Sequence, residues 1–128
     1  MIIGTGIDIV ETERVRALID RDGERFLGRW FGAEEIAYCG GKAKPYLHFA
    51  SRLAAKEAAF KALRLSKGAP ICWKHIVVVQ DEAGAPRLAL SGEPRAAAER
   101  LGATGLHVSL SHCGAYAIAA VTAEGSDR

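Results

Sequence analysis

The chain is organised around one stretch, Arg52-Leu53-Ala54-Ala55-Lys56-Glu57-Ala58-Ala59-Phe60-Lys61. Alanine, leucine, lysine and glutamate favour helix, and no glycine or proline interrupts them, so we expect the longest helix over residues 49–65. At about 100° per residue, four apolar residues share the arc that would face the core: Phe49, Leu53, Phe60 and Leu63. Lys56 lies inside that arc and Glu57 at its border, where a charge needs a partner or a shifted pKa.

The charges of this helix have an unusual arrangement. Arg52 and Lys56 are spaced i,i+4, which brings two cations together, and Glu57 and Lys61 are spaced i,i+4 in the favourable order. One carboxylate therefore lies among three cations beside an apolar face. One interpretation is a surface helix with a single ion pair and solvated lysines. The other is a site that combines cations and a metal ion to hold a phosphorylated ligand.

Composition limits the broader possibilities. The chain of 128 residues has the length of one domain, 1–128, and its 49% hydrophobic and 25% charged residues are ordinary for a globular protein. A net charge of +2 gives no indication of nucleic-acid binding. The three cysteines lack metal-type spacing, no signal peptide is visible, and no apolar run is long enough to span a membrane. We therefore expect a cytoplasmic protein with reduced thiols.

The N-terminal part contributes an aspartate and a basic stripe. Residues 2–10 alternate as a strand, with Asp8 between Ile7 and Ile9, although aspartate is disfavoured inside strands. Asp8 is either a strand residue bonded to nearby backbone or a metal ligand on a rigid element. Residues 12–22 should form a helix. Four residues on it and just beyond it form the basic stripe, Arg14, Leu18, Arg21 and Arg25, which is either a solvated face or a docking surface.

The remaining elements indicate the fold class. In chain order we expect helical residues 26–31, a short helix 33–39, a loop 40–45, a hairpin of strands 76–79 and 88–90, a helix 91–102, and strands 107–111 and 116–122. The alanine-rich last strand should allow the long helix to pack closely against it. This order predicts an α+β domain in which an antiparallel sheet packs on one long central helix.

Three motifs occur together in this chain: Gly6-Ile7-Asp8-Ile9-Val10-Glu11, Arg52-x-Ala54-x-Lys56-Glu57-Ala58-x-x-Lys61-Ala62, and His107-Val108-Ser109-Leu110-Ser111-His112. In this order and at this chain length they resemble the 4′-phosphopantetheinyl transferases, specifically the small bacterial holo-acyl-carrier-protein synthase group. Each motif alone is weak, but the three together are specific. The resemblance covers nearly the whole chain.

The resemblance implies a reaction and an assembly. Enzymes of this group move 4′-phosphopantetheine from coenzyme A to a serine of an apo-acyl carrier protein and release adenosine 3′,5′-bisphosphate. It also implies dependence on Mg²⁺, a role in fatty acid biosynthesis, and a homotrimer that binds coenzyme A between subunits. The expected fold is that of the 4′-phosphopantetheinyl transferases.

The resemblance also assigns residues. The implied catalytic residues are Asp8, Glu57, Lys61 and His107, and Asp8 and Glu57 are the magnesium ligands. The implied coenzyme A contacts are Arg52, Lys56, Lys61 and Ser111, and Lys44, from the loop before the long helix, is expected as a further cation at the same ligand. The carrier protein would dock on Arg14, Leu18, Arg21 and Arg25. Two carboxylates suit Mg²⁺, which takes phosphate and water oxygens for its other positions. The base for the serine proton stays open between a metal-held water, Asp8, Glu57 and His107.

Some positions depart from the family pattern. Three segments differ from the family: residues 64–68 replace a Gly-Thr-Gly-like turn, residues 75–77 replace Asp-Ile-Glu, and residues 49–52 replace an Ala-Arg-Arg segment. These differences leave the exact nucleotide contacts open and do not affect the metal pair. The alternatives are a transferase for a polyketide or peptide-pathway carrier protein, a non-catalytic coenzyme A or nucleotide-binding module, and a purely structural α+β domain. Asp8, Glu57 and Lys61 speak against the binding module, which would not need the metal pair, and a structural domain leaves the aspartate in the strand and the glutamate at the border of the helix arc unexplained.

Overall fold

The computed structural model describes residues 1–66 and 71–126. From the sequence, Gly68-Ala69-Pro70 is predicted to end the connection that follows the long helix, and this segment lies outside the described residues. Its elements run in the order expected for an α+β domain, with a 3₁₀ turn, η1, added before the hairpin. Their bounds are β1 (Ile2–Glu11), α1 (Thr12–Asp22), α2 (Glu24–Trp30), α3 (Ala33–Gly40), α4 (Pro45–Ala62), η1 (Trp73–His75), β2 (Ile76–Gln80), β3 (Pro86–Leu90), α5 (Gly92–Leu101), β4 (Ala103–Cys113) and β5 (Tyr116–Gly125).

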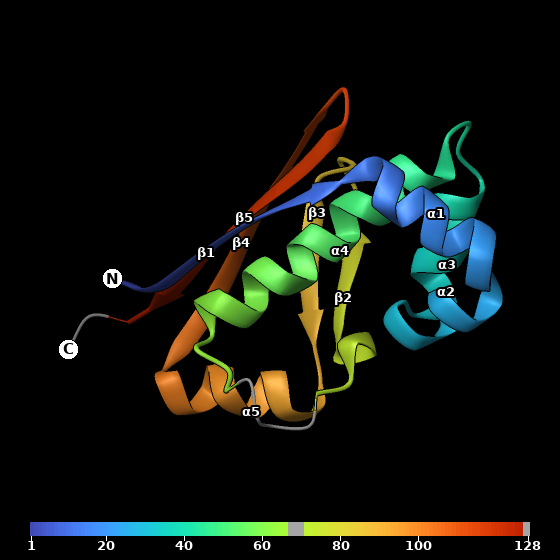
Figure 1. The fold of residues 1–128 in the computed structure, drawn as a ribbon. Coiled ribbons are helices and arrows are strands. Elements are labelled where there is room, and N and C mark those ends of the chain that lie inside the picture. Colours follow the sequence, from blue (N-terminus) through green and yellow to red (C-terminus); the bar gives the residue numbers. More distant parts are fainter. Residues whose placement is uncertain (67–70, 127–128) are drawn as a thin grey trace.

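Helix α4 is the longest helix and crosses one face of an antiparallel sheet with strand order β1-β5-β4, which confirms the expected architecture (Figure 1). Strands β2 and β3 form a separate antiparallel pair, and α1, α2 and α3 lie together at one end of α4 (Figure 1). Helix α4 begins four residues earlier than expected, because Pro45 occupies the first turn, where its fixed φ suits a helix. It ends at Ala62, and Arg64 then adopts a positive φ of 54°.

Small residues allow the sheet and α4 to approach backbone to backbone. A Cβ atom added to Gly6 would lie 1.9 Å from the carbonyl oxygen of Ala58, and one added to Gly4 would lie 2.1 Å from that of Ala62. From β5, four buried side chains contribute to this side of the sheet: Ala117, Ala119, Val121 and Ala123. The expected close packing of the alanine-rich strand is confirmed, and the glycines of β1 extend it.

The opposite face of the sheet carries large apolar side chains that are exposed in the single chain. Ile7 and Ile9 of β1 are 63% and 58% exposed, and Tyr116 and Ile118 of β5 are 49% and 37% exposed. Ile9 pairs with Ile118 across the two strands, so these side chains form one continuous patch. Such a patch is a common sign of an interaction surface.

Two further expectations about the chain can be compared with the structure. All three cysteines, Cys39, Cys72 and Cys113, are free thiols, as expected. Among the helices of the described residues, none combines the length and the hydropathy that a membrane crossing would need.

Candidate active site

The two predicted metal ligands come together where β1 lies against α4. Asp8 and Glu57 face each other, and the pKa of Glu57 is raised to about 7 by burial, then by the hydrogen bond that protonated Glu57 donates to Asp8, and by the Asp8 charge. Lys61 and Arg14 oppose that rise. The ammonium of Lys61 lies 3.3 Å from Asp8 Oδ1 and donates a 2.8 Å hydrogen bond to the carbonyl of Ile7. These groups form a small cluster of opposite charges on two rigid elements.

The donor set of this cluster fits a magnesium ion. In residues 1–66 and 71–126, Asp8 Oδ2 and Arg52 Nε are the buried side-chain polar atoms that have no hydrogen-bond partner. An unsatisfied carboxylate oxygen beside a carboxyl of raised pKa is the environment that a divalent cation would relieve. No third histidine, cysteine or carboxylate joins them within the described part of the chain, so phosphate and water oxygens would complete the Mg²⁺ shell.

A cleft of about 470 Å³ opens beside the carboxylate pair and joins it to the predicted docking stripe. Its basic lining residues are Arg14, Arg21, Arg25 and Arg29, and its apolar lining includes Leu18, Phe26, Trp30 and Leu53. Glu57 is distant from the stripe in the sequence, but the packing of α1 against α4 and of α2 against α1 places them around one cavity. A partner docked on the stripe would therefore lie directly at the carboxylates.

The prediction that Lys56 contacts coenzyme A is wrong, because its side chain is completely buried and fully occupied. Its ammonium donates to Glu35 Oε1 at 2.8 Å, to the carbonyl of Trp73 at 3.2 Å and to the carbonyl of Ile76. Burial lowers the pKa of Lys56, and the charge of Glu35 opposes that shift. The sequence-based expectation that a charge on this arc needs a partner or a shifted pKa is confirmed on both counts.

Arg52 is also buried, at 4% exposure, on a side of α4 that does not line the cleft. Its guanidinium carbon lies 4.6 Å from the centre of the Tyr38 ring, a cation–π distance. With the Gln80 amide oriented to donate to the carbonyl of Val79, its oxygen accepts from Arg52 and from the Tyr38 hydroxyl, both at 3.0 Å. A role of Arg52 in coenzyme A binding stays a prediction.

Lys44 lies in a different hollow from the carboxylate pair. It is exposed just before α4 and lines a pocket of about 530 Å³ together with Arg16 and Tyr46. The guanidinium carbon of Arg16 lies 5.1 Å from the centre of the Tyr46 ring. Lys44 is thus an accessible cation, as the predicted coenzyme A contact requires, but the single chain does not bring it into the cleft of Asp8.

The two predicted residues of β4 lie on the exposed face of the sheet. His107 and Ser111 point away from α4, and His107 Nε2 lies 3.1 Å from a carboxylate oxygen of Glu124. Asp8 of β1 and Leu110 of β4 both pair with Ala119 of β5, so they lie at the same level of the sheet. His107 lies three residues before Leu110 on β4. One chain therefore does not bring His107 and Ser111 together with the metal pair.

Sequence reasoning missed three residues that shape the site. Arg29 and Trp30 line the cleft, and Glu35 is the buried partner of Lys56. The aromatic and arginine residues of 26–31 were visible as a cluster, but nothing local indicated which of them face the carboxylates. Glu35 had no local signal, since its partner is 21 residues away.

Comparison with known proteins gives a consistent result. The sequence profile of the 4′-phosphopantetheinyl transferase superfamily matches residues 4–121. The holo-[acyl-carrier-protein] synthases of Koribacter versatilis and Geobacter sulfurreducens are 43% and 44% identical over 124 residues, covering 97% of this chain and 99% and 98% of theirs. The crystal structure of the Neisseria meningitidis synthase is similar, with a TM-score of 0.86 and 31% identity over 97% of this chain and 99% of that one. The Helicobacter pylori synthase in complex with coenzyme A has a TM-score of 0.81 and 31% identity over 94% and 99%.

Proposed function

Because this chain belongs to the 4′-phosphopantetheinyl transferase superfamily, we propose that it is a holo-acyl-carrier-protein synthase. It transfers 4′-phosphopantetheine from coenzyme A to a serine of an apo-acyl carrier protein in fatty acid biosynthesis. The serine oxygen forms the new bond to phosphorus, and the bond to adenosine 3′,5′-bisphosphate breaks. One observation carries this proposal: the Asp8–Glu57 pair, with Lys61 beside it, opens into a cleft lined by arginines.

Asp8 and Glu57 would hold Mg²⁺, which would neutralise charge on the pyrophosphate oxygens. The unpartnered Asp8 Oδ2 and the raised pKa of Glu57 support this assignment. Lys61, already held at Asp8 Oδ1, places a second positive charge on the same side of the pair. Phosphoryl transfer depends mainly on positioning and charge neutralisation, and these three side chains supply both.

The carrier protein would dock on Arg14, Leu18, Arg21 and Arg25. Acyl carrier proteins are acidic, and the four residues line the same cleft as the carboxylate pair. Electrostatic complementarity of this kind guides association and fixes the register of the complex. The shared cleft supports the view that docking presents the serine to the reacting phosphoryl group.

We further propose a homotrimer in which coenzyme A is bound between subunits. The exposed apolar patch of Ile7, Ile9, Tyr116 and Ile118 provides a surface for a second copy. His107 and Ser111 lie on the same face and away from Asp8 in their own chain, so they would serve the site of a neighbour.

The direct test is incubation of the protein with apo-acyl carrier protein, coenzyme A and Mg²⁺, followed by intact-mass analysis. We expect the carrier protein to gain one 4′-phosphopantetheine, and a carrier protein whose acceptor serine is replaced by alanine to gain none. Asp8→Ala and Glu57→Ala should abolish the transfer and leave the fold intact, whereas Glu82→Ala, in the exposed turn between β2 and β3, should not. Unchanged transfer in either site variant, or in excess EDTA, would refute the metal assignment.

A further inference from the structure

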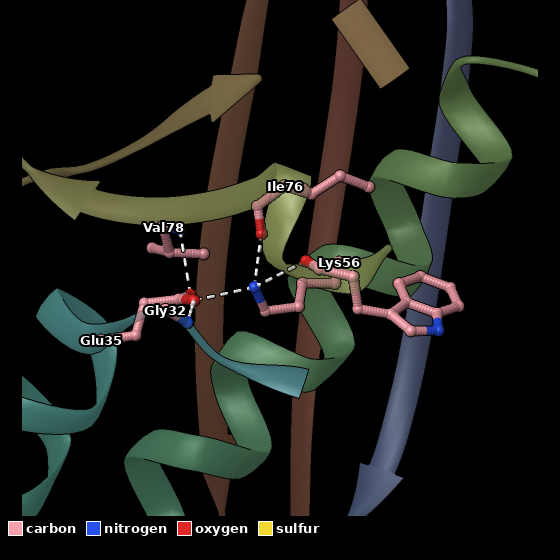
Figure 2. A network of polar contacts seen from close by, with 6 residues as sticks. Gly32, Glu35, Lys56, Ile76 and Val78 are labelled. Atoms are coloured by element: carbon pink, nitrogen blue, oxygen red, sulfur yellow. Dashed lines mark hydrogen bonds and ion pairs between the residues drawn. The ribbon is translucent and has the colours of Figure 1, made fainter. Parts of the chain in front are cut away.

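A buried ion pair connects the helix that carries Glu57 to the segment that carries the cleft wall. Lys56 and Glu35 both have fully buried side chains, and their charged groups are 2.8 Å apart. The three hydrogen bonds of the Lys56 ammonium reach Glu35 and the carbonyls of Trp73 and Ile76 (Figure 2). We call this pair the Glu35–Lys56 strut.

The Glu35 end of the strut holds the junction between α2 and α3. Glu35 Oε1, which accepts from Lys56, also accepts a 3.0 Å hydrogen bond from the backbone N–H of Gly32, and Oε2 accepts one of 3.1 Å from Val78 (Figure 2). Gly32 follows the last turn of α2, where Arg29 and Trp30 face the cleft. The position of this turn is thereby tied to α4 at the residue next to Glu57.

A second connection runs through aromatic rings. The carbonyl of Trp73 accepts from Lys56, and the Trp73 ring stacks on Trp30 with centroids 4.7 Å apart and an interplanar angle of 21°. Phe60, one turn after Lys56 on α4, lies 5.6 Å from the same ring. The strut therefore reaches Trp30 both through the backbone of Gly32 and through the Trp73 ring.

We propose that Glu35 and Lys56 are positioning residues that hold the α2 wall of the cleft in register with the Asp8–Glu57 pair. The wall comprises Arg25, Arg29 and Trp30. This inference rests on the proposed function, since register matters when a docked carrier protein must present its serine to the metal pair. A buried ion pair gives little stability over apolar residues of the same volume, so stability alone does not account for it, whereas directional hydrogen bonds at both ends define one geometry.

The first arm of the test is spectroscopic and independent of activity. The chain has two tryptophans, Trp30 and Trp73, and both belong to the stack, so near-ultraviolet circular dichroism reports on it directly. In Lys56→Met we expect this signal to fall by at least about half while the far-ultraviolet helix signal persists. If Lys56→Met does not fold, Glu35→Gln is the variant to measure, because it is a smaller change, and it should also lower the near-ultraviolet signal. Ala123→Gly, buried in β5 outside the strut, the tryptophan stack and the cleft, is the control for lower stability and should retain the signal.

The second arm is a double-mutant cycle with Arg25→Glu, measured as kcat/KM for the carrier protein. The penalty of Arg25→Glu should be at least about threefold smaller in the Lys56→Met background, because the wall is no longer in register, and unchanged in the Ala123→Gly background. The penalty is a ratio within one background, so a loss of folded enzyme that both members of the pair share cancels, and circular dichroism of each variant gives its folded fraction. A full tryptophan signal in both strut variants would overturn the positioning role of Glu35 and Lys56. So would an undiminished Arg25→Glu penalty in the Lys56→Met background, provided that the wild type is active. An inactive wild type would instead overturn the proposed function and, with it, the kinetic role.

Discussion

Gly6→Ala is the substitution whose cost the structure defines most sharply. The added Cβ would lie 1.9 Å from the carbonyl oxygen of Ala58, and ordinary contact begins at 3.4 Å, so β1 and α4 would have to separate by about 1.5 Å. Both partners are backbone, which cannot turn away as a flexible side chain can. Asp8 is two residues along β1, and Glu57 immediately precedes Ala58, so the separation would also open the carboxylate pair.

Overpacking of a core typically costs about 1–3 kcal/mol, and the rigidity of both partners places this variant at the upper end. For a chain of 128 residues, about 3 kcal/mol corresponds to a fall of roughly 10 °C in Tm. Turnover should also fall by about 10²-fold at temperatures where the variant is folded, since a misplacement of about 1 Å can cost that much.

The assay is thermal unfolding followed by circular dichroism, together with transfer measured by intact mass. Gly28→Ala is the matched control, because Gly28 lies within α2 and an added Cβ would meet nothing within 4 Å. That variant should be neutral or stabilised by up to about 1 kcal/mol, as expected for alanine in a helix. Wild-type Tm and turnover in Gly6→Ala would refute the claim that glycine at this position brings the two carboxylates together.

Four further outcomes are expected. The pKa of Glu57 is raised to about 7, so the folded protein keeps a proton that the unfolded chain releases above the ordinary pKa of 4.5. In EDTA, Tm should therefore fall as the pH rises from about 5 to about 8, and the fall should be smaller in Glu57→Gln. Added Mg²⁺ should restore Tm at the higher pH. Lys61→Ala should lower turnover by about 10²-fold, and a rise confined to the KM for coenzyme A would instead make it a uniform binding contact. Ile118→Glu should convert a trimer into monomers in sedimentation, and an active wild-type monomer at working concentrations would exclude the trimer. Arg14→Glu/Arg21→Glu should raise the KM for the carrier protein and leave that for coenzyme A unchanged, with an effect that weakens as salt rises; equal modification at low salt would place docking elsewhere.

Local patterns in the sequence were sufficient for the secondary structure and for the family. The uninterrupted helix formers of 52–61 define the centre of α4, and alternation along residues 2–10 and 116–122 defines two strands of the sheet. These signals are local because helix and strand periodicities follow from backbone geometry. Three motifs in one order were then sufficient to indicate the transferase family.

Two functional assignments depended on contacts that no local pattern encodes. Periodicity placed Lys56 on the inner arc of its helix, but only the fold shows that Glu35 and two carbonyls meet it there, which makes it a structural residue instead of a phosphate contact. The docking stripe and the metal pair were expected as separate features, and the packing of α1 on α4 and of α2 on α1 places them around one cleft.

The sequence by itself determined which chemical groups are available: two carboxylates at Asp8 and Glu57, Lys61 one helical turn after Glu57, and a basic stripe between the two carboxylates. Only the tertiary structure decided which of these groups face the cavity and which are buried in the core. The reason is physical: the free energy of a buried charge depends on partners brought close by folding, and those partners lie anywhere along the chain.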